Sequence, residues 1–326
     1  MTVSVCIISA GRVELLDALD SLGKQTLAPT EVLVLIDGDR QFAEQIALEY
    51  PNANVGVVSG FTLGGCRNQI VERSSGDLIL FIDDDVVVPT EFVAHLVRLA
   101  ESIPEVDVFG GPNLTLPEAA DRERLVGELL ASPWVTGPFS RRFRADVPQS
   151  NNLEDLVLCN LAIRRSAWQP FLDSLPEGEE TEFLYRLVGE NHRVVTTSDM
   201  SVWHRRRLTT SGLFEQMRRY GRGRSEAARA QPQALRPILL GLGGLATAVF
   251  VARRHFPLTY LMWLASQGLL RGIRLGDWRR GVDSVAFILT IQLGYPVGVV
   301  EGLMRPSSRE RGDVMWITSP SAGPPE

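Results

Sequence analysis

The sequence contains few cysteines, no leader-like segment and no excess of basic residues. Its three cysteines, Cys6, Cys66 and Cys159, are odd in number and far apart, which argues against a disulfide framework or a zinc site. We expect them to be reduced thiols in a cytosolic compartment. The apolar stretch 3–8 is too short for a signal peptide, so we expect none. A net charge of −6 predicts no nucleic-acid partner, and a hydrophobic content of 44% predicts a real core.

The basic residues are unevenly distributed. Between positions 205 and 236 the chain carries nine arginines but only two acidic residues, Glu215 and Glu226. A basic block beside apolar segments indicates contact with a membrane surface or with phosphate groups.

Strand and helix patterns alternate in the first 90 residues. Apolar, β-rich runs predict strands, and apolar residues at helical spacing predict helices between them. The predicted strands are 3–8, 31–36, 55–58 and 78–82, and the helices are 12–24, 42–50 and 64–74. This order predicts an α/β fold with a doubly wound, mostly parallel sheet and right-handed crossovers.

The pattern is less regular after Pro89. We expect helices at 91–102 and 179–189 and strands at 106–110, 157–163, 194–197 and 201–203. Residues 112–152 are rich in Pro, Gly, Ser and Arg, so we expect a long loop or lid with one helix near 121–131.

Residues 78–89 are the most informative stretch. Five apolar residues predict a strand buried on both faces, and Asp83, Asp84 and Asp85 follow at its carboxyl end, where open α/β sheets bind ligands. Adjacent carboxylates repel one another, and Asp83 and Asp85 could offer oxygens to one divalent cation. The alternative is a solvated acidic turn.

The last third of the sequence is strongly apolar. Residues 234–252 and 282–304 are long enough to cross a bilayer, whereas 258–270 are short, and an arginine-rich loop with a Trp separates the last two segments. We expect two spans with an interfacial or re-entrant segment, and the arginine block should face the cytoplasm. Core helices of a soluble α domain are the alternative.

Four segments resemble one known family. Residues 3–12, 25–39, 64–68 and 76–85 are similar, in order, to the nucleotide-binding half of family 2 glycosyltransferases with the GT-A fold. Matches at 158–164, 178–187, His204 and 216–223 extend the resemblance to about residue 225. The segment 220–224 and the C-terminal apolar helices resemble ExoA-like enzymes, which extend lipid-linked bacterial polysaccharides.

The resemblance implies a domain order. A GT-A catalytic domain should cover residues 1–225, with a nucleotide-binding half at 1–110 and an acceptor half at 111–225. Membrane-associated helices at 226–305 and a disordered tail at 306–326 should follow.

The resemblance also implies a nucleotide-sugar site. Its expected residues are Ser9, Asp37, Arg67, Asp83 and Asp84, with Asp37 bonding the nucleobase and Asp83 the ribose. From the residues alone, Asp37 could instead form an Asx turn with Gly38, and Arg67 could be a surface arginine.

A cation site is implied beside it. Asp85, Asp83 and His204 are the expected ligands of Mg²⁺ or Mn²⁺, which would bridge the phosphates of a nucleoside diphosphate. A lone His is more often structural.

The general base and the phosphate partners come from later motifs. Glu180 is the expected base, with Glu179 as the adjacent candidate, although acidic residues also favour a first helical turn. Arg219 and Arg222 are expected to pair with the diphosphate or a lipid-linked acceptor, and attraction to anionic lipid is the competing reading.

These expectations define an enzyme. It should be a metal-dependent inverting hexosyltransferase that uses a nucleotide-sugar donor, expected to be a UDP-sugar, and a lipid-linked saccharide acceptor in envelope or exopolysaccharide synthesis. Its catalytic domain should face the cytoplasm at the cytoplasmic membrane. The alternatives are a polyprenyl-phosphate glycosyltransferase, a nucleotidyltransferase, and a membrane scaffold with a degenerate transferase domain.

Overall fold

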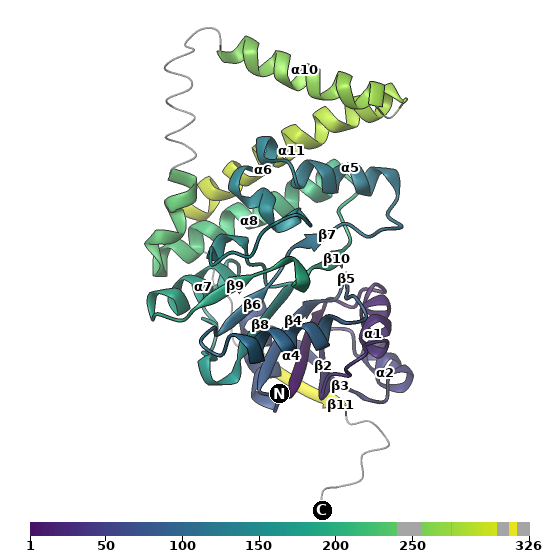
Figure 1. Cartoon of the computed structure of the whole chain (residues 1–326), viewed down its shortest axis with the longest axis vertical. Coiled ribbons are helices and arrows are strands. Elements are labelled where there is room, and N and C mark those ends of the chain that lie inside the picture. The colour runs from purple at the N-terminus through teal and green to yellow at the C-terminus, as the bar shows by residue number, and fades with distance from the viewer. Residues whose placement is uncertain (240–255, 275, 305–312, 318–326) are drawn as a thin grey trace, which may run out of the picture. The chain divides into compact units, whose positions relative to one another are not determined.

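The computed structural model describes residues 1–239, 256–274, 276–304 and 313–317, which belong to two units (Figure 1). The sheet unit comprises residues 1–118, 141–205 and the strand at 313–317. The helical unit comprises residues 119–140 and the described part of 206–306.

A mixed eight-stranded sheet forms the sheet unit, in the order β11-β3-β2-β1-β4-β8-β6-β9. Strand β1 pairs in parallel with β2 and β4, β2 with β3, and β6 with β9, whereas β8 and β11 pair antiparallel to their neighbours. This confirms the predicted α/β class with a doubly wound, mostly parallel sheet. The strands are β1 (Val3–Ser9), β2 (Glu31–Asp37), β3 (Ala53–Ser59), β4 (Leu78–Asp83), β6 (Val108–Gly110), β8 (Asn160–Arg164), β9 (Val194–Thr196) and β11 (Asp313–Ile317).

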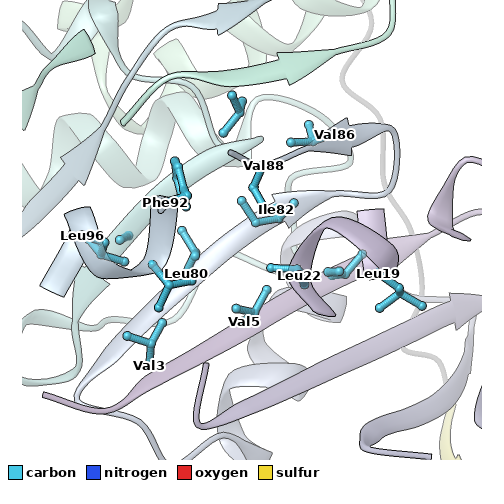
Figure 2. Close-up of a cluster of buried hydrophobic side chains, with 14 of the residues drawn as sticks. Val3, Val5, Leu19, Leu22, Leu80, Ile82, Val86, Val88, Phe92 and Leu96 are labelled. Carbon is cyan, nitrogen blue, oxygen red and sulfur yellow. The ribbon is translucent and has the colours of Figure 1, made fainter. Parts of the chain in front are cut away.

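The central strands are apolar throughout because helices cover both faces of the sheet. On one face, side chains of β1 and β4 such as Val5 and Leu80 pack with residues from α1 (Leu15–Gly23) and α4 (Phe92–Ser102), as Figure 2 shows. Helix α2 (Arg40–Glu49) contributes to the same layer. On the other face, the alternate strand residues pack against α3 (Leu63–Arg73) and α7 (Glu179–Gly189).

The topology brings two strand ends together. The chain runs from β1 outward to β2 and β3 and then returns to β4 on the opposite side of β1. At this reversal Ile8 is paired with Asp83, so the carboxyl ends of β1 and β4 are adjacent. Open α/β sheets bind their ligands at such a switch point.

A small second sheet continues from the end of β4. It consists of β5 (Val86–Val87), β10 (Val202–His204) and β7 (Asn113–Leu114), in the order β5-β10-β7. His204 is paired with Val86, which places the end of β10 beside the acidic run.

The region predicted as a lid contains more helical structure than expected. Helix α5 (Asp121–Leu130) matches the helix predicted there, but α6 (Pro133–Thr136) and the 3₁₀ segments η1 (Gly137–Phe143) and η2 (Leu153–Asp155) are additional. Two other 3₁₀ turns are η3 (Arg165–Ala167) and η4 (Ser198–Met200).

Helix α8 (Thr210–Ala230) organises the helical unit and packs along α11 (Trp278–Met304). A methyl group at Gly221 would collide with the carbonyl of Tyr295, and one at Gly298 with the carbonyl of Arg218, so these backbones are in direct contact. Residue 225, the predicted end of the catalytic domain, lies inside α8. The unit also contains η5 (Pro232–Leu235) and α10 (Phe256–Arg274).

The predicted membrane segments fall on both described and undescribed residues. Within the described residues, α11 is the helix long and apolar enough to cross a membrane, with 27 residues, a mean hydropathy of 1.5 and 39% of its most apolar window buried. The predicted segment 258–270 forms part of α10, while positions 240–252 of the first predicted span lie outside the described residues.

The prediction of a disordered tail does not hold for residues 313–317, which form β11 antiparallel to β3. An edge strand offers unpaired backbone groups, and the β-branched and aromatic residues of β11 suit such pairing. Trp316 is paired with Gly56, and the Arg73 guanidinium lies 4.6 Å from the Trp316 ring centroid.

We expect Trp316→Ala to lower the free energy of unfolding by about 1–2 kcal/mol, because it removes ring burial on Gly56 and the contact with Arg73. Chemical unfolding followed by circular dichroism measures this loss. The matched control is Met315→Ala, since Met315 is 44% exposed and should change stability by less than about 0.5 kcal/mol. Equal losses in the two variants would contradict a docked Trp316.

Candidate active site

Three carboxylates follow β4, and each meets a different set of partners. Asp84 and Asp85 are buried, whereas Asp83 is partly exposed. The Arg12 guanidinium bridges Asp84 at 3.0 Å and Asp85 at 2.8 Å. The Ser9 hydroxyl donates to Asp84 over 2.7 Å. The structure therefore brings together the predicted residues Ser9 and Asp84, and it adds Arg12, which the sequence analysis missed.

His204 presents one ring nitrogen to the carboxylates. Its Nδ1 lies 2.7 Å from the carbonyl oxygen of Arg205, which can only accept, so Nδ1 carries the hydrogen. In the neutral ring Nε2 then bears a lone pair. Nε2 lies 3.3 Å from Asp85 Oδ1 and 4.0 Å from Asp83 Oδ2. A lone pair facing two carboxylates is repulsive unless a cation or a proton is shared among them.

The charge of Asp83 is disfavoured where it stands. Partial desolvation and the neighbouring Asp85 charge raise the pKa of Asp83 to about 7, while the Arg67 guanidinium opposes the shift. Burial also raises the pKa of Asp84, against the effect of Arg12. Carboxylate oxygens suit Mg²⁺ and Mn²⁺, and an imidazole nitrogen adds a ligand for a transition-metal ion, so Asp83, Asp85 and His204 fit the predicted divalent-cation site.

A cysteine completes the group. One ligand atom from each of Asp83, Cys159 and His204 lies within 4.8 Å of the other two. Cys159 is buried, immediately before β8. No sequence motif indicated this proximity, because the three cysteines have no metal-site spacing.

Arg67 and Glu179 form a buried ion pair. Arg67 Nη1 contacts Glu179 Oε1, and the two residues are 8% and 6% exposed. The Arg67 guanidinium also lies 5.7 Å from the Phe171 ring centroid. Arg67 is thus an interior residue that links α3 with α7, and the surface-arginine reading is wrong.

Glu180 has a different environment from Glu179. Burial raises the pKa of Glu180, while Arg142 and the backbone N–H of Leu158 oppose the shift. The charge of Glu180 in turn contributes to the raised pKa of Asp83. Arg142, a further missed residue, contacts the Glu154 carboxylate at 3.5 Å.

Asp37, Arg219 and Arg222 were also predicted for the site. Asp37 is exposed at the carboxyl end of β2, followed by Gly38 with a φ of +74°. Arg219 and Arg222 lie on α8 in the helical unit, with Arg219 exposed and Arg222 half-buried.

This geometry agrees with a family match that spans half of the sequence. Residues 4–170 match the model of glycosyl transferase family 2. The chain belongs to this family. It is therefore a glycosyltransferase, and the matched residues include the acidic run after β4.

One known glycosyltransferase is similar to part of the chain. The uncharacterized glycosyltransferase YwdF of Bacillus subtilis is 30% identical over 113 residues, which cover 33% of this chain and 40% of YwdF. The chain thus matches less than half of that relative's length.

Two solved structures are similar to the chain. A mannosyltransferase from Pyrobaculum calidifontis, in complex with GDP-Man and Mn²⁺, has a TM-score of 0.54 at 15% identity, covering 92% of this chain and 86% of that one. S. aureus TarS in complex with UDP has a TM-score of 0.49 at 15% identity, covering 90% of each chain. The mannosyltransferase likeness supports the GT-A type of fold.

We expect Arg67→Met to lower the free energy of unfolding by about 3–5 kcal/mol, because it leaves the Glu179 charge buried without its partner. Urea unfolding followed by tryptophan fluorescence measures the loss. The double variant Arg67→Met/Glu179→Leu should recover a large part of it, since no buried charge then remains.

The matched control is the exposed pair Arg40–Glu44, at 2.8 Å and 66% and 49% exposed. Arg40→Met should cost less than about 1 kcal/mol. Similar losses in Arg67→Met and Arg40→Met would show that the Arg67–Glu179 pair does not hold α3 and α7 together.

Proposed function

We propose that this glycosyltransferase transfers a hexose from a nucleoside-diphosphate sugar to a lipid-linked saccharide at a membrane, in one inverting displacement assisted by a divalent cation. The observation that carries the proposal is the convergence of Asp83, Asp85 and His204 Nε2 at the switch point of the sheet. The charge of Glu180 acts on Asp83 of this group. Transfer requires a cation site for the donor's diphosphate and a general base for the attacking acceptor.

The cation site suits a leaving diphosphate. When a divalent cation is bound by Asp83, Asp85 and His204, it supplies positive charge that stabilises the departing diphosphate. The similar mannosyltransferase structure contains GDP-Man and Mn²⁺, which supports a nucleotide-sugar donor and a divalent cation here. We propose that Ser9, Asp37, Arg67 and Asp84 bind the nucleotide, and we retain a UDP-sugar as the expected donor.

Glu180 is the better candidate for the general base. Glu179 is engaged with Arg67 in a buried ion pair, whereas Glu180 has a raised pKa and its charge acts on Asp83. A raised pKa makes a carboxylate a stronger base at neutral pH. Glu180 takes the proton from an acceptor hydroxyl while that oxygen attacks the anomeric carbon opposite the diphosphate, so an α-linked donor gives a β-linked product.

The helical unit has an apolar surface suited to lipid. Helices α10 and α11 carry large apolar side chains that are each more than half exposed: Leu258, Leu261, Met262, Leu269, Leu270, Ile273, Trp278, Val282, Leu293, Val300, Leu303 and Met304. Arginines flank the turn between the helices, at positions 271, 274, 279 and 280. Apolar faces bordered by arginine and tryptophan favour binding at an anionic bilayer surface.

The packing of α11 favours docking at this surface over crossing the membrane alone. Arg218 of α8 forms a 2.6 Å ion pair with Glu301 of α11. Helix α8 carries five arginines, at positions 218, 219, 222, 224 and 229. Carrying such a helix into the bilayer core costs about 2.5–3.5 kcal/mol per centrally placed arginine. We propose that Arg219 and Arg222 instead bind phosphate groups of the diphosphate or of a lipid carrier.

Activity should depend on Glu180. The raised pKa of Glu180 should shift the acid side of the pH–activity profile to higher pH. Purified protein is incubated with UDP- and GDP-sugars, a lipid-linked saccharide and Mg²⁺ or Mn²⁺, and nucleoside diphosphate release is measured. We expect Glu180→Gln to lower turnover by about 10²–10⁴-fold. Because the ionised form is the base, wild-type activity should fall with decreasing pH at a value above the ordinary glutamate pKa of 4.5.

The controls separate the roles in that assay. Asp85→Asn should lower turnover by about 10²–10³-fold. In a separate measurement, NMR of the wild-type product should show the inverted anomer. If Glu180→Gln retains turnover and folded Glu179→Gln loses it, the base is Glu179. If nucleoside diphosphate is released with bare polyprenyl phosphate as the acceptor, the acceptor is that phosphate and not a lipid-linked saccharide.

Membrane binding should depend on α10. We expect the protein to float with phospholipid vesicles, more strongly when they contain phosphatidylglycerol, and Leu261→Glu/Leu269→Glu to abolish flotation. Each change removes about 1.5–3 kcal/mol of apolar burial. The matched control is Leu48→Glu on α2 of the sheet unit, where Leu48 is 73% exposed. Wild-type flotation of the α10 variant would refute this docking surface.

A further inference from the structure

The Cys159 thiol lies beside the predicted cation ligands Asp83 and His204, and the family resemblance did not predict it there. We propose that Cys159 coordinates the cation together with Asp83 and His204, so that the site accepts a thiophilic divalent ion such as Co²⁺ or Zn²⁺. This proposal rests on the cation site of the proposed function and specifies its metal preference.

A turn places the thiol beside the acidic run. Strands β4 and β8 are antiparallel, and their last pair before the site is Ile82 with Asn160. Cys159 lies in the turn that leads into β8, where the Asn160 N–H donates to the Val157 carbonyl, so it directly precedes the residue paired with the end of β4. His204 enters from β10 of the second sheet, through its pairing with Val86.

The atoms are close enough for one ion to join them. A carboxylate oxygen of Asp83, the sulfur of Cys159 and a ring nitrogen of His204 lie within 4.8 Å of one another. Around a tetrahedral Zn²⁺, bond lengths near 2.0–2.3 Å set neighbouring ligand atoms about 3.5 Å apart. Small side-chain rotations would bring the three ligand atoms from within 4.8 Å to this spacing.

Two outer contacts orient the ligands. The Asn113 side-chain amide donates a hydrogen bond to the Cys159 sulfur over 3.4 Å, and the Arg205 carbonyl accepts from His204 Nδ1. Metal-ligating side chains usually have such partners, which fix the ligand atom that faces the ion. Asn113 and His204 are both carried by the small second sheet, because β7 pairs with β10.

Sulfur changes which ions the site prefers. Mg²⁺ takes oxygen ligands, whereas Co²⁺ and Zn²⁺ accept sulfur, nitrogen and oxygen and bind more tightly than Mn²⁺ at mixed sites. Coordination replaces the S–H bond of Cys159 with a sulfur–metal bond, and the proton passes to the buffer. No change of oxidation state is involved.

Cobalt absorption tests the proposal directly. Co²⁺ is titrated into the full-length, reduced protein, and the near-ultraviolet sulfur-to-cobalt charge-transfer band is recorded, with bound Co²⁺ and Mn²⁺ measured by equilibrium dialysis. We expect the band in wild type, its loss in Cys159→Ser and its retention in Cys66→Ser, whose cysteine is buried on α3. Cys159→Ser should weaken Co²⁺ binding more than Mn²⁺ binding. Circular dichroism verifies that the variants are folded.

The outcomes distinguish failure of the proposed sulfur ligand from failure of the proposed cation site. Co²⁺ binding without the band, or a band that persists in folded Cys159→Ser and Cys159→Ala, overturns the sulfur ligand and leaves the proposed function standing. If neither ion binds wild type while nucleotide-sugar turnover proceeds without metal, both the sulfur ligand and the proposed cation dependence are wrong.

Discussion

Mutual repulsion among Asp83, Asp84 and Asp85 is the constraint on which the active site depends. Three adjacent carboxylates at the end of a buried strand are tolerated only where opposite charge or hydrogen-bond donors surround them. Arg12 and Ser9 hold Asp84, and Arg12 also holds Asp85. Arg12 reaches neither oxygen of Asp83 at ion-pair distance, and the pKa of Asp83 is raised to about 7 by burial and by the charge of Asp85. The repulsion among the three carboxylates is therefore relieved by Arg12 at Asp84 and Asp85 and by a raised pKa at Asp83.

Local patterns in the sequence were sufficient for the central fold and for part of the site. Unbroken apolar runs predicted β1, β2 and β4, and their alternation with helices predicted the doubly wound sheet. That topology alone places residues after β1 and β4 together, so Ser9 and Asp84 could be predicted as neighbours without the structure. The pairing of Asp85 with His204 depended on the family resemblance, because 119 positions separate them in the sequence.

Other features arise from contacts that no local pattern encodes. Cys159 reaches the site because it lies in the turn before β8, whose Asn160 is paired with Ile82 of β4. The pairing of Arg67 with Glu179 requires the packing of α3 near α7. Residues 313–317 form a strand only because β3 is an available edge, so their own sequence predicted a tail.

The return of the chain at β11 has a mechanical consequence. The helical unit comprises two stretches, 119–140 and 206–306, and each leaves the sheet unit and leads back to it, so four chain crossings join the two units. Each further anchor limits the volume that an inserted unit explores, because it closes a loop. The last crossing leads to β11, so the pairing of β11 with β3 closes the longer of the two stretches.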